Sequence, residues 1–285
     1  MKETRPTVTE KRALFRSLHQ SGCFVLPNPW DIGSALYLQH LKFKAIATSS
    51  AGFAFSRGLP DNGVPLDVML THIREVVNAT DIPVNADFEN GFAHAPAEVA
   101  VNVKRCLEAG VAGLSIEDST GDKRDPLYDL PRAIERMRAA RAAMNEAAKD
   151  AILVGRAECF LVGRNDIAEV VRRLQAYAEA GADCLYAPGI ETREDVAAVV
   201  KAVAPKPVNI LISAPGGLTV ADAADLGVRR VSVGGALARV AWGGFIQAAR
   251  GLAEKGTFEA FAQAAPHREL NDFFRANNLR IQEIR

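Results

Sequence analysis

Cysteine is scarce in this chain, and its four cysteines stand far apart, at Cys23, Cys106, Cys159 and Cys184. No CxxC pair is present, and no signal-peptide pattern precedes the first tryptophan. Free thiols of this kind are typical of a reducing compartment, so we expect a cytoplasmic protein.

Long hydrophobic runs and an excess charge are also absent. A membrane-spanning helix needs roughly 20 apolar residues, and every apolar run here is broken within about eight. Lysine plus arginine equals aspartate plus glutamate at 34 each. The sequence therefore predicts no membrane segment, and nothing in its net charge calls for a nucleic acid or an anionic membrane as partner.

Short apolar runs rich in Val, Ile and Leu are present, and they alternate with segments of helical period. We count eight such runs: CFVLPNP, KAIATSS, IPVNADF, AGLSIED, AILVGRA, DCLYAPG, VNILISA and RRVSVGG. Strands that are apolar on both faces suit a parallel sheet covered by helices. Eight strand and helix units favour an α/β fold of the (β/α)8 TIM barrel type, with a doubly wound sheet as the alternative.

The intervening helices follow from apolar residues at spacings of three and four. The pattern predicts helices over Pro65–Thr80, Ala95–Ala109, Pro131–Lys149, Asn165–Ala180 and Thr192–Val203. A weak repeat, a helix end followed by glycine and a strand, recurs in EAGVAGLSIED, EAGADCLYAPG and DLGVRRVSVGG. Gly110, Gly181 and Gly227 are therefore expected just after helix C-caps.

Both ends of the chain extend beyond the eight units, and residues 1–285 are predicted to form one domain. Residues 1–22 predict a polar helix that covers the bottom of the barrel or leads into the first strand. Residues 236–285 predict C-terminal helices, longer than a barrel needs to close. A cap over the barrel's own end and a helix packed against a neighbouring subunit explain this tail equally well.

Acidic side chains follow three successive strands, at the barrel end where catalytic residues gather. They are Asp87 and Glu89, then Glu117 and Asp118, and then Glu158 after Arg156. A single acid would fit a helix cap or a surface ion pair equally well. Several carboxylates at one barrel mouth would repel one another unless a cation lay among them.

The donors in this group are oxygen atoms, without His or Cys at metal-ligand spacing. The expected cofactor is therefore Mg²⁺, with Mn²⁺ as a substitute, held by few direct ligands and several waters. Asp87 and Glu89 are candidate metal ligands, and Asn90-Gly91 allows a sharp turn beside them.

Other residues near the strand ends suit an anionic substrate. The Arg156 guanidinium can bind a carboxylate through two hydrogen bonds, although an ion pair with Glu117 or Glu158 would be its structural role. The second strand ends in TSSAGFAFSRGLPD, in which Ser49 and Ser50 offer hydroxyl and amide groups. Asp31, in NPWD, fits a helix N-cap.

In this order and spacing, NPWDIGSA, TSSAGFAFSRGLPD, VNADFENGF, GLSIED and VGRAE resemble the isocitrate lyase and phosphoenolpyruvate mutase superfamily, from about residue 28 to 235. The resemblance implies a (β/α)8 barrel that assembles as a dimer or tetramer, with a helix of residues 236–285 exchanged between subunits. It also implies Mg²⁺ and a small 2-oxo or 2-hydroxy carboxylate. Its motifs place metal contacts at Asp87, Glu89 and Glu117, and substrate contacts at Ser49, Ser50, Ala51, Asp61 and Arg156.

The loop after the fourth strand departs from that pattern. Lyases of the superfamily carry a Lys-Lys/Arg-Cys-Gly-His motif there, whereas this chain has STGDKRDPLYD, without Cys or His. The candidate catalytic residues are Arg156, Glu117, Lys123 and Tyr128, and Asp125 is a further candidate proton carrier.

The expected activity is a Mg²⁺-dependent lyase that cleaves a carbon–carbon bond or decarboxylates through an enolate-like intermediate. The alternatives are phosphorus–carbon chemistry on phosphonopyruvate and a non-catalytic binder of 2-oxo acids. His94 is expected at the surface and Cys159 in the core.

Overall fold

The computed structural model describes residues 5–282, and its central element is a sheet of eight parallel strands. The strands are β1 (Phe24–Leu26), β2 (Ile46–Ala47), β3 (Val84–Asp87), β4 (Gly113–Glu117), β5 (Ile152–Arg156), β6 (Cys184–Tyr186), β7 (Val208–Leu211) and β8 (Arg230–Ser232). Each of the eight predicted runs contains one of them. Their spatial order runs β1-β8-β7-β6-β5-β4-β3-β2, so the sheet curls into a nearly closed (β/α)8 barrel. The expected barrel is confirmed, and the alternative of an open doubly wound sheet is wrong, because β1 pairs with β8.

The barrel closes at a seam between β1 and β2, which are not joined by a regular ladder in the described part of the chain. One backbone hydrogen bond between described residues crosses it, from the Ala47 amide to the Pro27 carbonyl at 3.1 Å. The Asn28 side chain adds to this closure. Its amide nitrogen donates to the Thr48 carbonyl, and its oxygen accepts from the amides of Val233 and Gly234.

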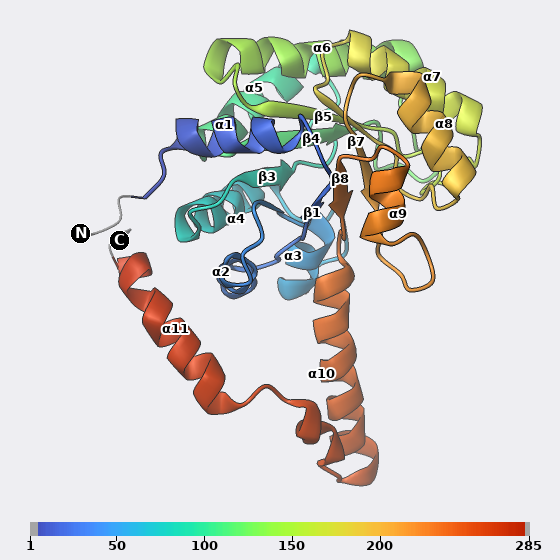
Figure 1. Cartoon of the computed structure of the whole chain (residues 1–285). Coiled ribbons are helices and arrows are strands. Elements are labelled where there is room, and N and C mark those ends of the chain that lie inside the picture. The colour runs from blue at the N-terminus through green and yellow to red at the C-terminus, as the bar shows by residue number, and fades with distance from the viewer. Residues whose placement is uncertain (1–4, 283–285) are drawn as a thin grey trace.

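Helices cover the outside of the barrel (Figure 1). They are α2 (Ile32–His40), α3 (Ser50–Ser56), α4 (Leu66–Ala79), α5 (Pro96–Glu108), α6 (Leu130–Ala147), α7 (Ile167–Glu179), α8 (Arg193–Val203) and α9 (Val220–Asp225). The five helices predicted from periodicity match α4 to α8 within about two residues at each end, the usual uncertainty of such boundaries. Asp31 caps α2 as expected, by accepting a hydrogen bond from the Ser34 amide.

The predicted glycines follow the helix C-caps. Gly110, Gly181 and Gly227 have φ of 85°, 108° and 86°, a left-handed backbone that favours glycine. Gly181 is also crowded, because a Cβ there would lie 2.6 Å from Cγ of Arg141.

Helix α1 (Val8–Leu18) closes the N-terminal end of the barrel. Phe15 is fully buried and belongs to the same apolar cluster as Leu26, Val154 and Cys184 of the barrel interior. The His19 ring packs edge-on against Phe15 and Phe24. The expectation that the N-terminal helix covers the barrel bottom is therefore confirmed.

The C-terminal segment leaves the barrel as an arm, formed by α10 (Ala236–Lys255), a 3-10 turn η1 (Glu259–Gln263) and α11 (His267–Gln282). Figure 1 shows α10 extending away from the strands and α11 running back toward the N-terminal half. The returning helix contacts α2, since the Phe273 ring lies 5.2 Å from Tyr37 and 5.3 Å from His40. Along α10 and η1, by contrast, Val240, Phe245 and Phe258 are more than half exposed.

Across residues 5–282, the helices lack the combination of length and apolar character that a bilayer crossing requires.

Candidate active site

A cavity of about 180 Å³ opens at the C-terminal ends of the strands. This volume is below the roughly 300–1,000 Å³ of pockets that hold drug-sized ligands, so it suits a molecule of a few carbon atoms. Six of the predicted site residues line it: Ser49, Ser50, Ala51, Asp61, Asp87 and Arg156. The structure therefore brings these predicted residues, which come from separate segments of the chain, to one cavity.

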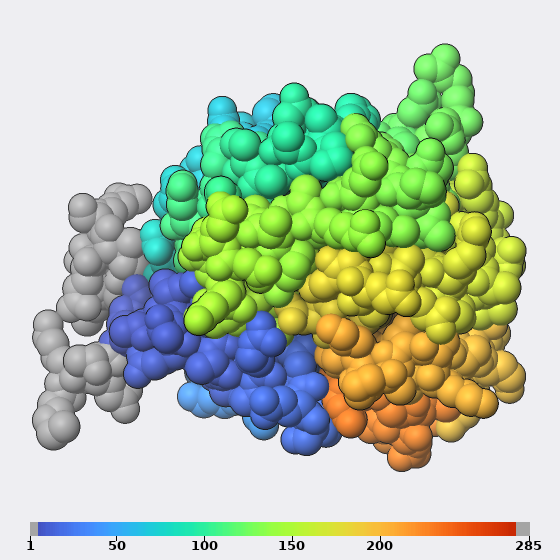
Figure 2. All heavy atoms as spheres, turned by 90° about the horizontal axis from the view of Figure 1, so that it is seen from above, coloured from blue at the N-terminus to red at the C-terminus, as the bar shows by residue number. Residues whose placement is uncertain are grey.

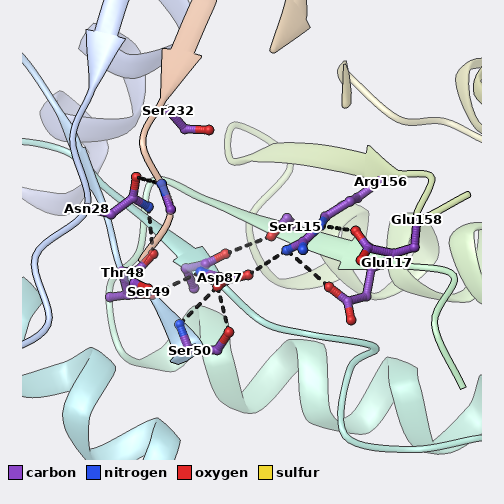
Figure 3. A network of polar contacts seen from close by, with 12 residues as sticks. Asn28, Thr48, Ser49, Ser50, Asp87, Ser115, Glu117, Arg156, Glu158 and Ser232 are labelled. Atoms are coloured by element: carbon purple, nitrogen blue, oxygen red, sulfur yellow. Dashed lines mark hydrogen bonds and ion pairs between the residues drawn. The ribbon is translucent and has the colours of Figure 1, made fainter. Parts of the chain in front are cut away.

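Asp87 ends β3 in the middle of this group (Figure 3). Its Oδ2 accepts hydrogen bonds from the Ser50 amide at 2.9 Å and from the Ser50 hydroxyl at 2.8 Å. Its own backbone amide donates to the Thr48 hydroxyl at 2.9 Å. These contacts leave Oδ1 of Asp87 directed to the other side of the site, where Arg156 lies.

Arg156 ends β5 and is the cation among the acids. Its Nη1 lies 3.2 Å from Oδ1 of Asp87 and 3.0 Å from Oε2 of Glu117, and its Nε donates to Glu158. The ion pairs with Glu117 and Glu158 that the sequence allowed are both present. Nη2 of Arg156 makes no hydrogen bond to any described residue, which leaves one edge of the guanidinium for a ligand.

The acids outnumber this cation. Glu89 is buried next to Asp87 and Asp61, and burial together with those charges raises the pKa of the Glu89 carboxyl to about 8. Burial also raises the pKa of Glu117 well above its usual value, against the opposing effect of Arg156. Oε1 of Glu89 has no hydrogen-bond partner among the described residues. A second cation at this position would satisfy both the orphan oxygen and the excess negative charge.

The backbone also holds Glu89 in an unusual conformation, with φ of 45°. Non-glycine residues in the left-handed region carry strain, which recurs at functional sites. The turn that follows uses Gly91, whose φ is 78° as expected for the Asn-Gly pair.

The acids do not form a ready-made cage: among residues 5–282, no group of three His, Cys, Asp or Glu side chains is arranged to hold a metal ion directly. Mg²⁺ commonly takes one or two carboxylates and fills its other positions with water and substrate oxygens. Asp87, Glu89 and Glu117 are compatible with that kind of site.

Asp118 points away from the cavity, because successive side chains of a strand face opposite sides of the sheet. Its Oδ2 accepts hydrogen bonds from Arg173 at 2.9 Å and from the Tyr177 hydroxyl at 2.6 Å. Asp118 and its two partners are buried, and their contacts connect the end of β4 to α7. The interpretation of this acid as part of the barrel-mouth group is wrong.

The loop between β4 and α6 carries the remaining candidates away from the cavity. Lys123 is exposed, and Figure 2 shows this segment, in green at the upper right, projecting beyond its neighbours. The Tyr128 hydroxyl lies 2.5 Å from Nδ1 of His94, which is exposed as expected, and Arg136 lies over the Tyr128 ring. Neither Lys123 nor Tyr128 lines the cavity, so their catalytic roles stay predictions.

Sequence reasoning missed several polar cavity residues that lie within the strands or close to their ends. They include Asn28, Asn85, Ser115, Tyr186, Arg230 and Ser232. The signal available was a polar side chain inside an apolar strand run, since such a residue in a barrel strand either faces the interior with a partner or faces solvent. Alternation alone does not say which.

Comparisons with known proteins show which sequences and structures this chain resembles. The family model described as phosphoenolpyruvate phosphomutase matches residues 15–253. A crystal structure from Burkholderia cenocepacia J2315, provisionally described as a lyase or mutase, is 46% identical, with a TM-score of 0.91 over 94% of this chain and 97% of that one.

Two curated enzymes are also similar. The 2-methylisocitrate lyase of Escherichia coli is 36% identical over 55% of this chain and 54% of that enzyme. The oxaloacetate decarboxylase of Paraburkholderia xenovorans is 29% identical over 78% of this chain and 74% of that enzyme.

Proposed function

Because the chain belongs to the phosphoenolpyruvate phosphomutase family, whose relatives include lyases, we propose that it is a Mg²⁺-dependent lyase. It would act on a small 2-oxo or 2-hydroxy carboxylate or dicarboxylate, by carbon–carbon cleavage or decarboxylation. The observation that carries this proposal is Arg156, which lines a small cavity and lies between Asp87, Glu117 and Glu158. Its Nη2 makes no hydrogen bond to the part of the chain that the structure describes.

The chain's own groups account for substrate binding. Nη2 of Arg156 donates to the substrate carboxylate, and the Ser49 hydroxyl and the Ala51 amide are further candidate contacts, because both residues line the same cavity. The Ala51 amide makes no hydrogen bond within the described residues, so it too can donate. The three carboxylates around Arg156 fix the orientation of its guanidinium before the substrate arrives, which lowers the cost of ordering it on binding.

A divalent cation fits beside Asp87, with Glu89 and Glu117 as its further contacts. When bound, it supplies electrostatic stabilisation of the negative charge that develops on a substrate oxygen when a bond next to a carbonyl breaks. Ser50 holds Asp87 in position through two hydrogen bonds.

Proton transfer is assigned to the loop between β4 and α6. Lys123 is its candidate donor, with Tyr128 as the alternative, and either role requires the loop to move from its projecting position toward the cavity. We also propose a cytoplasmic location and a homo-oligomer, dimer or tetramer, in which the apolar residues of α10 contact a partner subunit.

Phosphorus–carbon chemistry on phosphonopyruvate is the second candidate, and the description of the matching family model favours it. Phosphorus NMR after incubation with phosphonopyruvate separates the two activities, because rearrangement or hydrolysis changes the phosphorus signal. A non-catalytic binder would give stabilisation by 2-oxo acids without any product.

Metal-dependent binding and turnover test the proposal together. Purified protein is screened with Mg²⁺ or EDTA against oxaloacetate, isocitrate, methylisocitrate and malate derivatives, by thermal shift and product analysis. A ligand present at about 100 times its Kd should add roughly 2.7 kcal/mol of stability. Asp87→Ala should lower turnover by about 100-fold or more, since a metal supplies several kcal/mol of transition-state stabilisation.

Asp67→Ala is the matched control, since Asp67 is an exposed acid that pairs with Arg105 on the outside of the barrel. It should behave like the wild type. Product formation that is equal in EDTA and in Mg²⁺, or equal in the Asp87→Ala variant, would contradict the proposal.

A further inference from the structure

Arg230 is a buried cation that the chemistry described so far leaves without a role. It is the first residue of β8 and is 2% exposed. Its Nε donates to Oδ1 of Asn209 at 2.8 Å, while Nη1 is buried and has no partner among the described residues. No described carboxylate forms an ion pair with it.

Three other arginines, buried or half-buried, have carboxylate or carbonyl partners. Arg156 contacts three carboxylates, Arg173 pairs with Asp118 and Glu169, and Arg136 donates to three backbone carbonyls. Transfer of a guanidinium from water to the protein interior without a counter-ion is strongly unfavourable. Because no described carboxylate pairs with Arg230, its counter-ion would be a negative group from outside the protein.

The position of Arg230 gives it access to a ligand. It lines the same cavity as Arg156, although the two residues stand at opposite ends of their strands, Arg156 last in β5 and Arg230 first in β8. Its neighbours there, Asn209 and Ser232, are polar but uncharged and hydrogen-bond to each other at 3.0 Å. The cavity thus offers one guanidinium near its mouth, compensated by acids, and a second, uncompensated one on its floor.

We propose that Arg230 binds a second carboxylate of the substrate and thereby selects dicarboxylates over monocarboxylates. The proposal rests on the proposed function in taking small carboxylic acids as the ligands. A planar guanidinium matches the two oxygens of a carboxylate, and burial away from water strengthens the charge-assisted hydrogen bonds. A monocarboxylate would place a methyl group beside Arg230 and leave the guanidinium buried without a counter-ion. Its binding should therefore be weaker than that of the matching dicarboxylate.

The test uses pairs of ligands that differ only at the distal group. The pairs are malate and 2-hydroxybutyrate, oxaloacetate and 2-oxobutyrate, and succinate and butyrate, each measured by calorimetry with Mg²⁺ present. In the wild type, the dicarboxylate of at least one pair should bind 30-fold or more tightly than its partner. Arg230→Met should weaken that dicarboxylate at least 30-fold and change its monocarboxylate partner less than threefold.

Arg229→Met is the matched control, because Arg229 is the preceding residue and faces outward, where it donates to the Gly22 carbonyl. It should keep the wild-type preference. Arg230→Lys keeps the positive charge without the planar guanidinium, and it should recover part of the preference for dicarboxylates. This variant guards against a folding defect in Arg230→Met. The unliganded melting temperature of Arg230→Met should equal or exceed that of the wild type, because an unpaired buried charge has been removed.

Two results would overturn the inference: no pair in which the wild type prefers the dicarboxylate by tenfold, or a preference that Arg230→Met leaves intact. Loss of both members of a pair to the same extent would mean a structural role and would overturn it too. The readout is binding, so a protein that shows the Arg230-dependent preference but no turnover would sink the proposed lyase activity and leave this inference standing.

Discussion

At the scale of single residues, buried polar groups without hydrogen-bond partners lower the stability of the barrel. His19 lies at the N-terminal end of the barrel, and its Nδ1 is 2.7 Å from the Phe15 carbonyl, so this nitrogen carries the proton and Nε2 is the acceptor. Nε2 is buried without a partner among the described residues. Burial, followed by the charge of Arg230, lowers the pKa of His19 to about 3. The ring therefore stays neutral in the folded protein at every pH where the protein is expected to work.

Acid should destabilise the protein through His19. Between pH 6.5 and about 3 the unfolded chain binds a proton that the folded chain does not. The contribution of His19 to stability is thus complete above pH 6.5 and declines as the pH falls, by up to about 1.4 kcal/mol per unit. Urea denaturation of wild type and His19→Gln at pH 7 and pH 4.5 measures it.

His19→Gln should lose less stability than the wild type between pH 7 and pH 4.5. His267→Gln, at an exposed histidine of α11, should keep the wild-type slope. Equal slopes for His19→Gln and wild type would show that this ring does not govern acid stability.

At the scale of elements, the segment between β3 and α5 is fixed from a distance. Arg136 of α6 is 1% exposed and donates to the carbonyls of Asn90, Ala93 and His94. Asn90 directly follows Glu89, so this guanidinium sets the path of the segment that carries a candidate metal contact. It is a positioning residue and does not reach the cavity itself.

Arg136→Met should destabilise the protein by about 3 kcal/mol, because three carbonyls lose a charged donor inside the protein. Hydrogen exchange of residues 88–95 should become faster than in the wild type, and Mg²⁺-dependent ligand stabilisation should weaken. Arg132→Met, on the same helix but only partly buried and paired with Glu135, should cost less than about 0.5 kcal/mol of stability. Unchanged exchange in residues 88–95 would argue that the segment holds its shape without Arg136.

These elements also show what the sequence could and could not predict. The strands were predictable because they are short apolar runs, as expected of strands buried on both faces. Helices α4 to α8 were predictable because their apolar residues recur at spacings of three and four. Asp87 and Arg156 were predictable because they end strands, and Ser50 because it closely follows one, since parallel strands bring their ends together. Arg136 was not, since its partners are backbone carbonyls more than 40 positions away. Arg230 was missed because RRVSVGG offers two adjacent arginines, and only the fold decides which faces inward.

At the scale of the whole molecule, the arm of α10, η1 and α11 exposes more apolar surface than a lone barrel would favour. Trp242 and Phe245 pack edge-on against each other at 5.4 Å, and they are 40% and 61% exposed. Exposed aromatic clusters of this kind commonly mark interfaces between proteins. This arrangement supports the proposed oligomer, in which α10 would lie against a partner subunit.

Replacing both aromatics, Trp242→Glu with Phe245→Glu, should shift the protein toward the monomer, because two carboxylates would be buried without partners in the interface. Light scattering coupled to size-exclusion chromatography measures the mass. Val101→Glu, at an exposed apolar residue of α5, should leave the mass unchanged. A wild-type protein that is already monomeric at micromolar concentration would rule out this assembly.

The seam between β1 and β2 gives the barrel wall an uneven stiffness. Seven strand pairings are continuous, whereas the contact between β1 and β2 consists, within residues 5–282, of one backbone hydrogen bond and one from the side chain of Asn28. Asn28 and Thr48 at the seam also line the cavity. Fewer hydrogen bonds therefore hold this side of the wall than the side that carries Arg156, and separating β1 from β2 should cost less free energy than separating any other pair of neighbouring strands.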